Sequence, residues 1–458
     1  MRIFGGKSGS YCDGVRRRDF LQIGMAGIGT AGLGSILRAR DASAASTGTS
    51  RQTSVILLWL DGGPSHHDTY DPKPEAPREY AGIWQPIQSC VPGMDFCELF
   101  PLQAQRADKF SLIRSLHHRT GDHFTGGHWM LTGRGGVSGA MTAGKYPFFG
   151  SIATSVTGPR AAGMPPLVSI PHAMSIGLRP GYFGANYLGN QYDPFQTNGD
   201  PNRPNFAVDN LALPANMTLS RLEDRRGLRA AFDTLRKQVD QSGTLEAMDR
   251  FDQMAYELVT GDRARKAFNI DAEEAAVRDK YGRHTWGQCA LLARRLVEAG
   301  TTFVTCHLGG WDTHWDHQKR MEEYLPRVDQ IVSSLFDDLS ERGLLDQVMV
   351  LVMGEFSRTP KMNNGGNGGP PLSQGTPGRD HWGGAISVLV GGGGIRGGQV
   401  IGSTDRLGEF PQSRPLLPGD LHHTIFQVLG VNPEIHFEDH TGRPVIAIDH
   451  GRVISELV

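Results

Sequence analysis

Short apolar segments that run into glycine turns and acidic residues constrain the fold of this chain most strongly. Three such segments occur, at residues 54–60, 301–308 and 348–353. Their unbroken apolar character predicts strands that are buried on both faces. Asp61, Asp312 and Glu355 follow these strands, each close to a glycine. Because ligands gather at the carboxyl ends of parallel strands, we expect these carboxylates to lie together, where their mutual repulsion requires a cation.

Helical patterns alternate with the apolar segments over most of the chain. Further strands are predicted at 112–115 and 385–390, and helices within 126–133 and at 286–299, 318–342 and 421–429. This alternation predicts an α/β fold, a doubly wound and mainly parallel sheet flanked by helices. Residues 160–215 are rich in Pro, Gly and Asn, and amphipathic helices are expected near 217–240 and 244–266. We therefore interpret 160–280 as an inserted irregular and helical cap.

Histidines join the acidic residues in the loops that follow the strands. The segment 309–317 reads G-G-W-D-T-H-W-D-H and brings Asp312 and His314 close together. Imidazole and carboxylate together suit zinc, manganese or iron, whereas carboxylate alone favours calcium or magnesium. The alternative is a solvated polar loop. Asp61 by itself reads as a turn residue, but His66 and His67 in the same loop favour a metal role.

Two further loops carry candidate site residues. In G-E-F-S-R-T-P at 354–360, Arg358 could hold a tetrahedral oxyanion, or it could form an ion pair with Glu355 that shapes the loop. In G-R-D-H-W at 378–382, Asp380 and His381 form a ligand pair, or a histidine held by an outer carboxylate. The glycine-rich loop at 363–378 could close over a substrate.

A hydroxyl near a predicted helix start is a candidate nucleophile. Thr125 lies where free backbone N–H groups favour an anion, although threonine is also a common helix cap. Ser65 is a second candidate hydroxyl, and a serine after Gly-Pro is also a common turn residue.

Several motifs together resemble a known family. M-L-T-G-R at 130–134 and D-L-H-H-T-I-F-Q-V-L-G at 420–430 resemble segments of sulfatases and related phosphodiesterases. With W-D-T-H at 311–314, G-E-F-S-R-T-P, G-R-D-H-W and G-R-P at 442–444, the chain from 51 to 458 resembles the domain-of-unknown-function 1501 family, a branch of the alkaline-phosphatase-like superfamily.

The resemblance implies a two-metal hydrolase of phosphate or sulfate esters, with zinc, manganese or calcium. Asp61 and Glu355 would hold the ion nearest the nucleophile. The second ion would be held by Asp312, His314 and His381, with Asp380 as a ligand or outer partner. The metals would polarise a phosphoryl or sulfuryl oxygen and stabilise the leaving oxygen.

This sequence departs from the superfamily pattern at the nucleophile. The usual nucleophile position falls on His123, and Thr125 is the nearest hydroxyl. The sulfatase pattern C-x-P-S-R is absent, and with it the formylglycine route. Where relatives have an Asp-His ligand pair, the chain has Glu355 and Phe356, so His66 or His67 is the candidate replacement.

The N-terminus resembles a twin-arginine export signal. Arg17 and Arg18 precede D-F-L-Q, an uncharged run of 15 residues follows from 23 to 37, and an A-x-A site allows cleavage after Ala44. That run is too short to span a bilayer, which needs about 20 residues. We therefore expect residues 1–44 to direct the protein to the periplasm or outside the cell. A basic arm before a buried helix and a retained membrane anchor are the alternatives.

The net charge and the cysteines of the chain limit its possible partners and cross-links. The net charge is −2, and it becomes −6 without the seven basic and three acidic residues of 1–44, so nucleic acid is not an expected partner. Cys90 and Cys97 could form a disulfide in an oxidising compartment, whereas Cys289 and Cys306 are expected to be buried thiols. The leading hypothesis is an exported metal-dependent ester hydrolase acting on a small molecule or polysaccharide. A protein that only binds anionic glycans and a phosphosugar mutase are the rivals.

Overall fold

The computed structural model describes most of the chain beyond the predicted signal. The described residues are 53–135, 145–208, 211, 253, 256–258, 260–364 and 376–458. They belong to one compact unit, residues 52–458. The predicted signal at 1–44, the helix near 217–240 and most of the glycine-rich loop lie outside the described residues.

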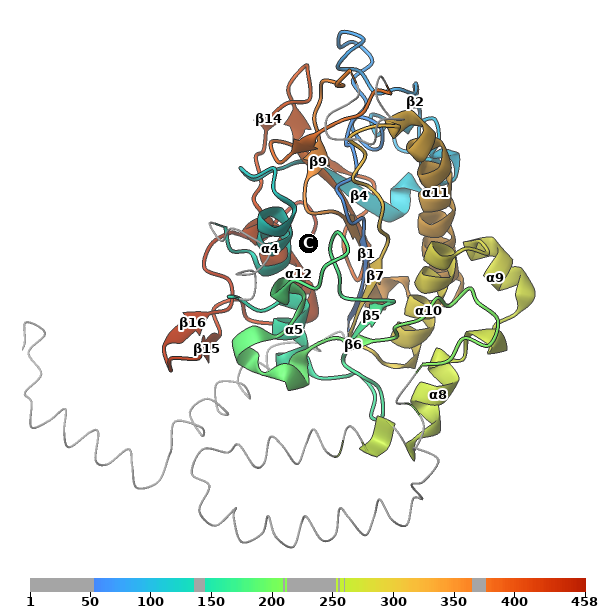
Figure 1. The fold of residues 1–458 in the computed structure, drawn as a ribbon, viewed down its shortest axis with the longest axis vertical. Helices are drawn as coiled ribbons and strands as arrows, with labels where there is room; N and C mark the ends of the chain where they lie inside the picture. Colours follow the sequence, from blue (N-terminus) through green and yellow to red (C-terminus); the bar gives the residue numbers. More distant parts are fainter. Residues whose placement is uncertain are drawn as a thin grey trace, which may run out of the picture. The chain divides into compact units, whose positions relative to one another are not determined.

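An eight-stranded sheet forms the centre of this unit (Figure 1). Its strands are β1 (Ser54–Trp59), β4 (Phe110–Leu116), β5 (Leu167–Ile170), β6 (Phe195–Gln196), β7 (Phe303–His307), β8 (Val348–Met353), β11 (Ile386–Gly392) and β12 (Val400–Ile401). Their order is β12-β4-β11-β8-β1-β7-β5-β6. Among the described strands of this sheet, only β11 pairs antiparallel with its neighbours. The predicted mainly parallel sheet is therefore confirmed.

Helices cover both faces of the sheet, as the doubly wound prediction requires (Figure 1). One face carries α3 (Pro101–Ala104), α8 (Asp262–Phe268), α9 (Ala275–Tyr281), α10 (Thr285–Ala299) and α11 (His317–Glu341). The other carries α4 (His123–Thr132), α5 (Phe149–Thr157) and α12 (Pro418–Leu429). Short 3-10 turns lie at Ala107–Lys109, Gly181–Phe183, Asn186–Leu188, Asn190–Tyr192, Ile270–Ala272 and Leu345–Gln347.

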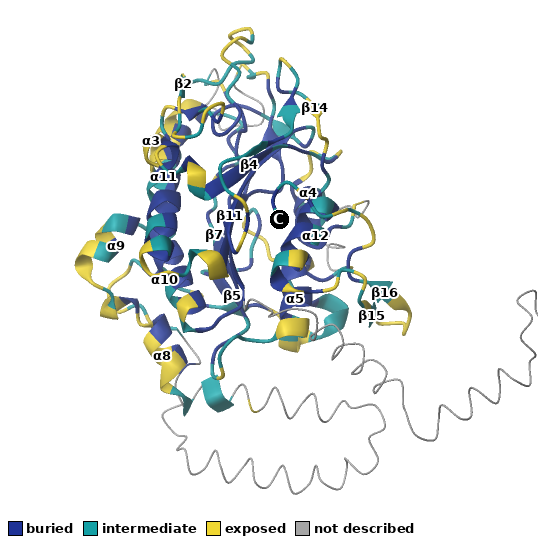
Figure 2. Cartoon of the chain, turned by 180° about the vertical axis from the view of Figure 1, so that it is seen from behind, coloured by how far each residue is buried: buried dark blue, intermediate teal, exposed yellow. Residues whose placement is uncertain are grey.

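The central strand β1 is buried on both faces, so polar and apolar residues do not alternate in its sequence. Ile56 and Leu58 pack into the core beneath α10 and α11, whereas Leu57 and Trp59 pack into the core beneath α4, α5 and α12. All four side chains are fully buried, as Figure 2 shows for the strands as a group. Each such side chain contributes about 1.5–3 kcal/mol relative to an exposed one.

Four small hairpins surround the sheet. They pair β2 (Pro86–Ile87) with β3 (Phe96–Cys97), β9 (Ser357–Arg358) with β10 (His381–Trp382), β13 (Ser403–Thr404) with β14 (Pro411–Ser413), and β15 (His436–Glu438) with β16 (Pro444–Ile446). In the β9–β10 pair, Arg358 lies opposite His381. This hairpin therefore brings two of the predicted motifs together.

The structure differs from the predictions for the segment 160–280 and for Cys90 and Cys97. The stretch 160–280 supplies β5 and β6 to the sheet, so its described part is not confined to a cap. The predicted disulfide between Cys90 and Cys97 is wrong, because both thiols are free, with Cys90 exposed and Cys97 buried in the core. Cys289 and Cys306 are buried thiols, as predicted.

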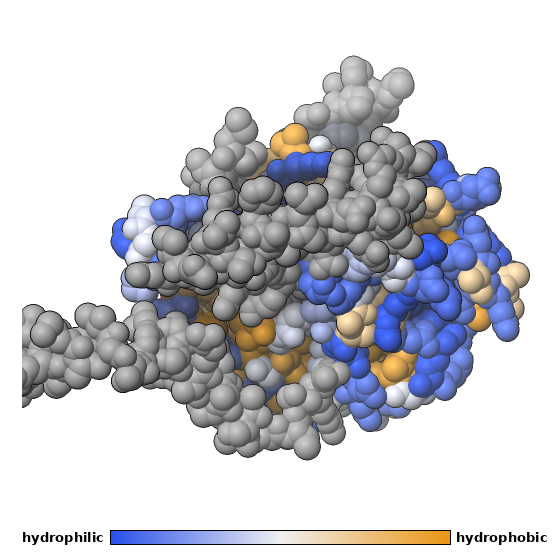
Figure 3. All heavy atoms as spheres, turned by 90° about the horizontal axis from the view of Figure 1, so that it is seen from below, coloured by the Kyte–Doolittle hydropathy of each residue, from blue (hydrophilic) through white to orange (hydrophobic). Residues whose placement is uncertain are grey.

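One face of the described surface is largely polar (Figure 3). Figure 3 shows one face on which hydrophilic residues predominate among the described atoms, with smaller hydrophobic groups between them. Among the helices of the described ranges, none combines the length and the apolar character that crossing a membrane requires.

Candidate metal centre

The carboxyl ends of β8, β1 and β7 meet at one edge of the sheet, since these strands are parallel neighbours. Gly62 holds the loops that follow them in contact. A Cβ atom there would lie 2.4 Å from the backbone nitrogen of Asp312, and its φ of +112° suits glycine alone. Its N–H also donates to both carboxylate oxygens of Glu355, at 2.9 and 3.1 Å. The turn after Asp61 thus joins the loops that carry the other two acids.

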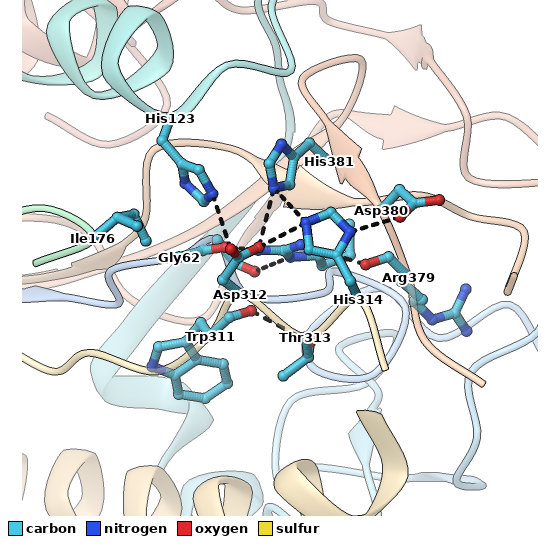
Figure 4. A network of polar contacts seen from close by, with 12 residues as sticks. Gly62, His123, Ile176, Trp311, Asp312, Thr313, His314, Arg379, Asp380 and His381 are labelled. Atoms are coloured by element: carbon cyan, nitrogen blue, oxygen red, sulfur yellow. Dashed lines mark hydrogen bonds and ion pairs between the residues drawn. The ribbon is translucent and has the colours of Figure 1, made fainter. Parts of the chain in front are cut away.

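A triangle of ligand-type atoms lies at this edge. His314 Nε2 and His381 Nε2 are each 3.0 Å from Asp312 Oδ1, and they are 2.9 Å from each other. Figure 4 shows both rings directed at Asp312. Ligands bound at 2.0–2.1 Å are about 2.9 Å apart at right angles and about 3.4 Å apart in a tetrahedron. The triangle therefore has the spacing of a coordination sphere for a small divalent ion.

The outer nitrogens of both rings are held by acceptors. His314 Nδ1 lies 2.6 Å from Asp380 Oδ1, and His381 Nδ1 lies 2.6 Å from the carbonyl oxygen of Gly121. A proton on each Nδ1 leaves the Nε2 lone pairs facing Asp312. Histidines that bind metals commonly donate their second N–H to a carboxylate or carbonyl in this way.

The protonation of this pair also fits a bound cation. Contact with Asp312 raises the pKa of His314. Burial lowers the pKa of His381. Two Nε2 atoms 2.9 Å apart have room for one proton between them, and without an ion that proton belongs on His314. A divalent cation would replace it and satisfy both lone pairs.

His123, the first residue of α4, adds a third histidine beside Asp312, His314 and His381. It comes from the face of the sheet that carries α4, α5 and α12. Its Nδ1 lies 2.6 Å from Glu355 Oε1, and its Nε2 lies 3.3 Å from Asp312 Oδ2. Ligand atoms of His123, Asp312 and His381 all lie within 4.8 Å of one another. Burial opposes a charge on His123, but the hydrogen bonds with Asp312 and Glu355 outweigh it and raise its pKa to about 9.

Arg358 lies behind Asp312 and is fully buried. Its guanidinium donates to Asp312 Oδ1 at 2.7 Å, to the carbonyl of Gly62, to that of Gly63 at 3.0 Å and to that of Arg379 at 3.3 Å. It therefore orients Asp312 and fixes the turn after β1. This placement favours neither the predicted contact with a substrate oxyanion nor the alternative ion pair with Glu355.

Asp61 and Glu355 occupy the deeper part of the site. Asp61 Oδ2 accepts from the N–H of Ile176 at 2.8 Å and lies 3.1 Å from His307 Nε2. Burial works against ionisation of Asp61, but contacts led by that with His307 lower its pKa. Burial and the nearby charge of Asp61 raise the pKa of Glu355. His307 and Ile176 were not predicted, although a histidine ending an apolar strand was a visible signal for the first.

The candidate hydroxyls lie apart from these ligand atoms. Thr125 is the third residue of α4, and its hydroxyl donates to Asp122, the cap of that helix, at 2.7 Å. Ser65 is buried, and its hydroxyl donates to Asp68 at 2.6 Å. Among the described residues, neither hydroxyl is hydrogen-bonded to the histidine cluster.

The remaining histidines of the motifs belong to a buried network beneath the site. His66 contacts the hydroxyl of Ser357 and lies 2.8 Å from the carbonyl of Gly408. His67 packs against His66, with ring centroids 4.3 Å apart. In the described chain the His66 ring is hydrogen-bonded to Ser357 and Gly408, and neither nitrogen of the buried His67 ring has a hydrogen-bond partner. Neither ring is hydrogen-bonded to Asp61 or Glu355, where a replacement ligand was expected.

Asp68 is the centre of that network. Its Oδ2 lies 2.8 Å from Arg379 Nε and 2.9 Å from His317 Nε2, and its Oδ1 accepts from the N–H of Ile83 at 2.8 Å. The side chains of Asp68, Arg379 and His317 are fully buried. Arg379 directly precedes Asp380 and His381. The network thereby anchors the segment that carries two of the candidate site residues.

Comparisons with solved structures find similarities at low sequence identity. A sulfatase from a Pseudoalteromonas species is 14% identical, with a TM-score of 0.36, over 87% of this chain and 71% of that one. An alkaline phosphatase superfamily protein from Vibrio parahaemolyticus is 9% identical, with a TM-score of 0.39, over 83% and 67%. A phosphonate monoester hydrolase from Silicibacter pomeroyi is 12% identical, with a TM-score of 0.37, over 88% and 76%.

Family-level similarity covers nearly the whole compact unit. No curated protein matches the chain. The family described as "Protein of unknown function (DUF1501)" matches residues 52–458, which confirms the resemblance seen in the motifs. The chain belongs to this family.

Proposed function

We propose that the protein is a metal-dependent hydrolase of phosphate or sulfate esters that acts outside the cytoplasm. The observation that carries the proposal is the triangle formed by Asp312, His314 and His381, with both outer ring nitrogens bonded to acceptors. Two or three imidazoles beside a carboxylate favour zinc or manganese over calcium.

A second ion position fits the deeper acids. Glu355 is fully buried and its pKa is raised by burial and by the charge of Asp61. A buried carboxylate whose ionisation is disfavoured by burial and by a neighbouring carboxylate is stabilised by a cation. We therefore retain Asp61 and Glu355 as the proposed ligands of the second ion.

Bound divalent ions would polarise the ester and stabilise its leaving oxygen. The chain's own residues supply orientation. Arg358 fixes Asp312, while Asp380 and Gly121 fix the two rings. His123 holds its Nε2 toward Asp312 and its Nδ1 toward Glu355, so we propose that it binds the ion instead of attacking the ester.

One observation favours the rival, a protein that binds anionic glycans without hydrolysing them. The hydroxyl of Thr125 is bonded to Asp122, and the buried hydroxyl of Ser65 is bonded to Asp68. Neither candidate hydroxyl is directed at the cluster, so hydrolysis would require attack by water. Turnover is therefore the measurement that separates the two functions.

The test is ester hydrolysis by the purified protein before and after chelation. We expect turnover of p-nitrophenyl phosphate or p-nitrophenyl sulfate, its loss with a chelator, and its recovery with zinc or manganese. His381→Ala should reduce the rate at least 100-fold, whereas His440→Ala, at an exposed histidine, should not. A rate that survives both chelation and His381→Ala would refute the proposal. Absence of turnover with a bound ion would favour the rival.

A further inference from the structure

A cavity opens directly beside the candidate metal centre. It has a volume of about 570 Å³, and His381 forms part of its wall. Sites for small molecules commonly enclose about 300–1,000 Å³. The hydrogen bond from His381 Nδ1 to the carbonyl of Gly121, another residue of the wall, joins the cavity to the metal triangle. A ligand in this space would therefore adjoin a group bound at Asp312.

One wall of the cavity is aromatic. The rings of Trp382 and Phe410 pack with centroids 5.3 Å apart. Phe410 is 53% exposed, the largest exposed fraction among the exposed large hydrophobic residues of the described chain. The indole N–H of Trp382 already donates to the carbonyl of Glu409 at 2.7 Å. What these residues offer a ligand is therefore ring surface.

A second wall of the cavity is basic and polar. Arg119 is exposed, and no hydrogen bond or ion pair to it is found among the described residues. Next to it, His118 donates from its ring to the carbonyl of Glu355 at 2.7 Å, and burial lowers its pKa to about 4, so this ring adds no charge. Arg119 is thus an available cation for an anionic group.

Glycine allows the two walls to approach each other. A Cβ atom on Gly383 would lie 2.4 Å from His118 Nδ1 and 2.4 Å from the carbonyl oxygen of Thr120. The residue after Trp382 must therefore be glycine for the aromatic segment to lie against the segment that carries Arg119. The backbone N–H of His118 also donates to the carbonyl of Gly383 at 2.8 Å, so the two segments are hydrogen-bonded neighbours in the lining of the cavity.

We propose that this cavity is a subsite for the sugar ring of an anionic glycan, whose esterified oxygen lies at the metal centre and whose second anionic substituent pairs with Arg119. A sugar ring has apolar C–H faces suited to Trp382 and Phe410 and polar hydroxyl groups suited to the neighbouring polar wall. The assignment rests on the proposed function, because that function places the ester at Asp312. It narrows the proposed substrates to esters of sugars.

Saturation-transfer NMR tests this assignment with defined probes. The probes are glucose 6-sulfate, glucose 6-phosphate and the chondroitin 6-sulfate disaccharide, which carries a carboxylate as a second anion, with glucose as the uncharged comparison. We expect transfer to sugar ring protons of the charged probes, strongest for the disaccharide. Phe410→Ala and Arg119→Gln should each weaken disaccharide binding at least fivefold.

Matched controls separate the subsite from general surface effects. Val156→Ala removes another exposed apolar side chain, 44% exposed, and Arg265→Gln removes another exposed arginine. Both should bind the disaccharide like the unmodified protein, and thermal melting should show all four variants folded. The assignment would be overturned if no charged probe binds. It would also be overturned if Phe410→Ala and Arg119→Gln bind the disaccharide as well as the unmodified protein does.

The outcome distinguishes the subsite from the proposed function. If p-nitrophenyl esters are hydrolysed but no charged sugar binds, the subsite is wrong and the hydrolase stands. If no ester is hydrolysed but the disaccharide binds through Phe410 and Arg119, the hydrolase is wrong and the subsite stands.

Discussion

Replacing Asp68 with asparagine removes the negative charge from the buried network beneath the metal centre. Asp68 and Arg379 have fully buried side chains, and their contact is 2.8 Å. Asparagine keeps the size of the side chain and an acceptor for the N–H of Ile83. It leaves the guanidinium of Arg379 without a counterion. Breaking a buried pair from one side costs about 3–5 kcal/mol. We expect the free energy of unfolding to fall by about 3 kcal/mol. This is the lower end of that range, because asparagine keeps the shape of the aspartate side chain.

The sign of the pH dependence follows from the same pair. Burial opposes ionisation of Asp68, but the charge of Arg379 and the contact with His317 outweigh it, so its pKa is well below the usual value. The stabilisation is present above the unfolded pKa of about 3.9 and is lost as the pH falls through the folded pKa. The difference between the variant and the unmodified protein should therefore be constant from pH 6 to 8.

Urea unfolding, followed by tryptophan fluorescence and far-UV circular dichroism, measures this cost where the two transitions coincide. The matched control is Asp262→Asn, which removes the partner of Arg265 in an ion pair whose side chains are 70% and 56% exposed. Exposed pairs contribute about 0–1 kcal/mol. If Asp68→Asn lowers the free energy of unfolding no more than Asp262→Asn does, the network does not hold a charged pair. Its anchoring role is then refuted.

Three further outcomes are expected. Arg358→Lys keeps a charge but cannot contact Asp312 and the turn after β1 together, so metal affinity measured by calorimetry should fall at least tenfold; an unchanged affinity would contradict its positioning role. His123 has a pKa of about 9 without metal, so ion binding at pH 7 should release a proton, and the affinity should rise with pH up to about 9. The buffer takes up that proton, so observed heats of binding that are identical in buffers of different ionisation enthalpy would contradict this. Replacing Arg17 and Arg18 by lysine should retain the protein in the cytoplasm on cell fractionation, and unaltered export would exclude the twin-arginine route.

The sheet was predictable where a strand is long and apolar. β1 and β8 each have six residues and are buried on both faces, so their sequences alone indicate their type. β5 and β6 have four and two residues and lie in a segment rich in proline and glycine. Their strand conformation depends on pairing with β7 and with each other, which local sequence does not encode.

The site was predictable where ligands follow strands. Asp312 and His314 share one loop, and parallel strands place that loop beside Glu355. The acceptor for His381, the carbonyl of Gly121, is 260 positions away and has no side chain to signal its role. The burial of Arg358 likewise depends on the turn after β1, since two of its acceptors are the backbone carbonyls of Gly62 and Gly63 in that turn.

A crystal structure of the protein with zinc or manganese, using anomalous scattering, tests the central claim most directly. We expect an ion about 2.0–2.2 Å from an oxygen of Asp312 and from Nε2 of both His314 and His381. Asp312→Asn should remove that ion while leaving the fold unchanged. An ion bound elsewhere, no ion at all, or full occupancy in Asp312→Asn would contradict the proposed metal site.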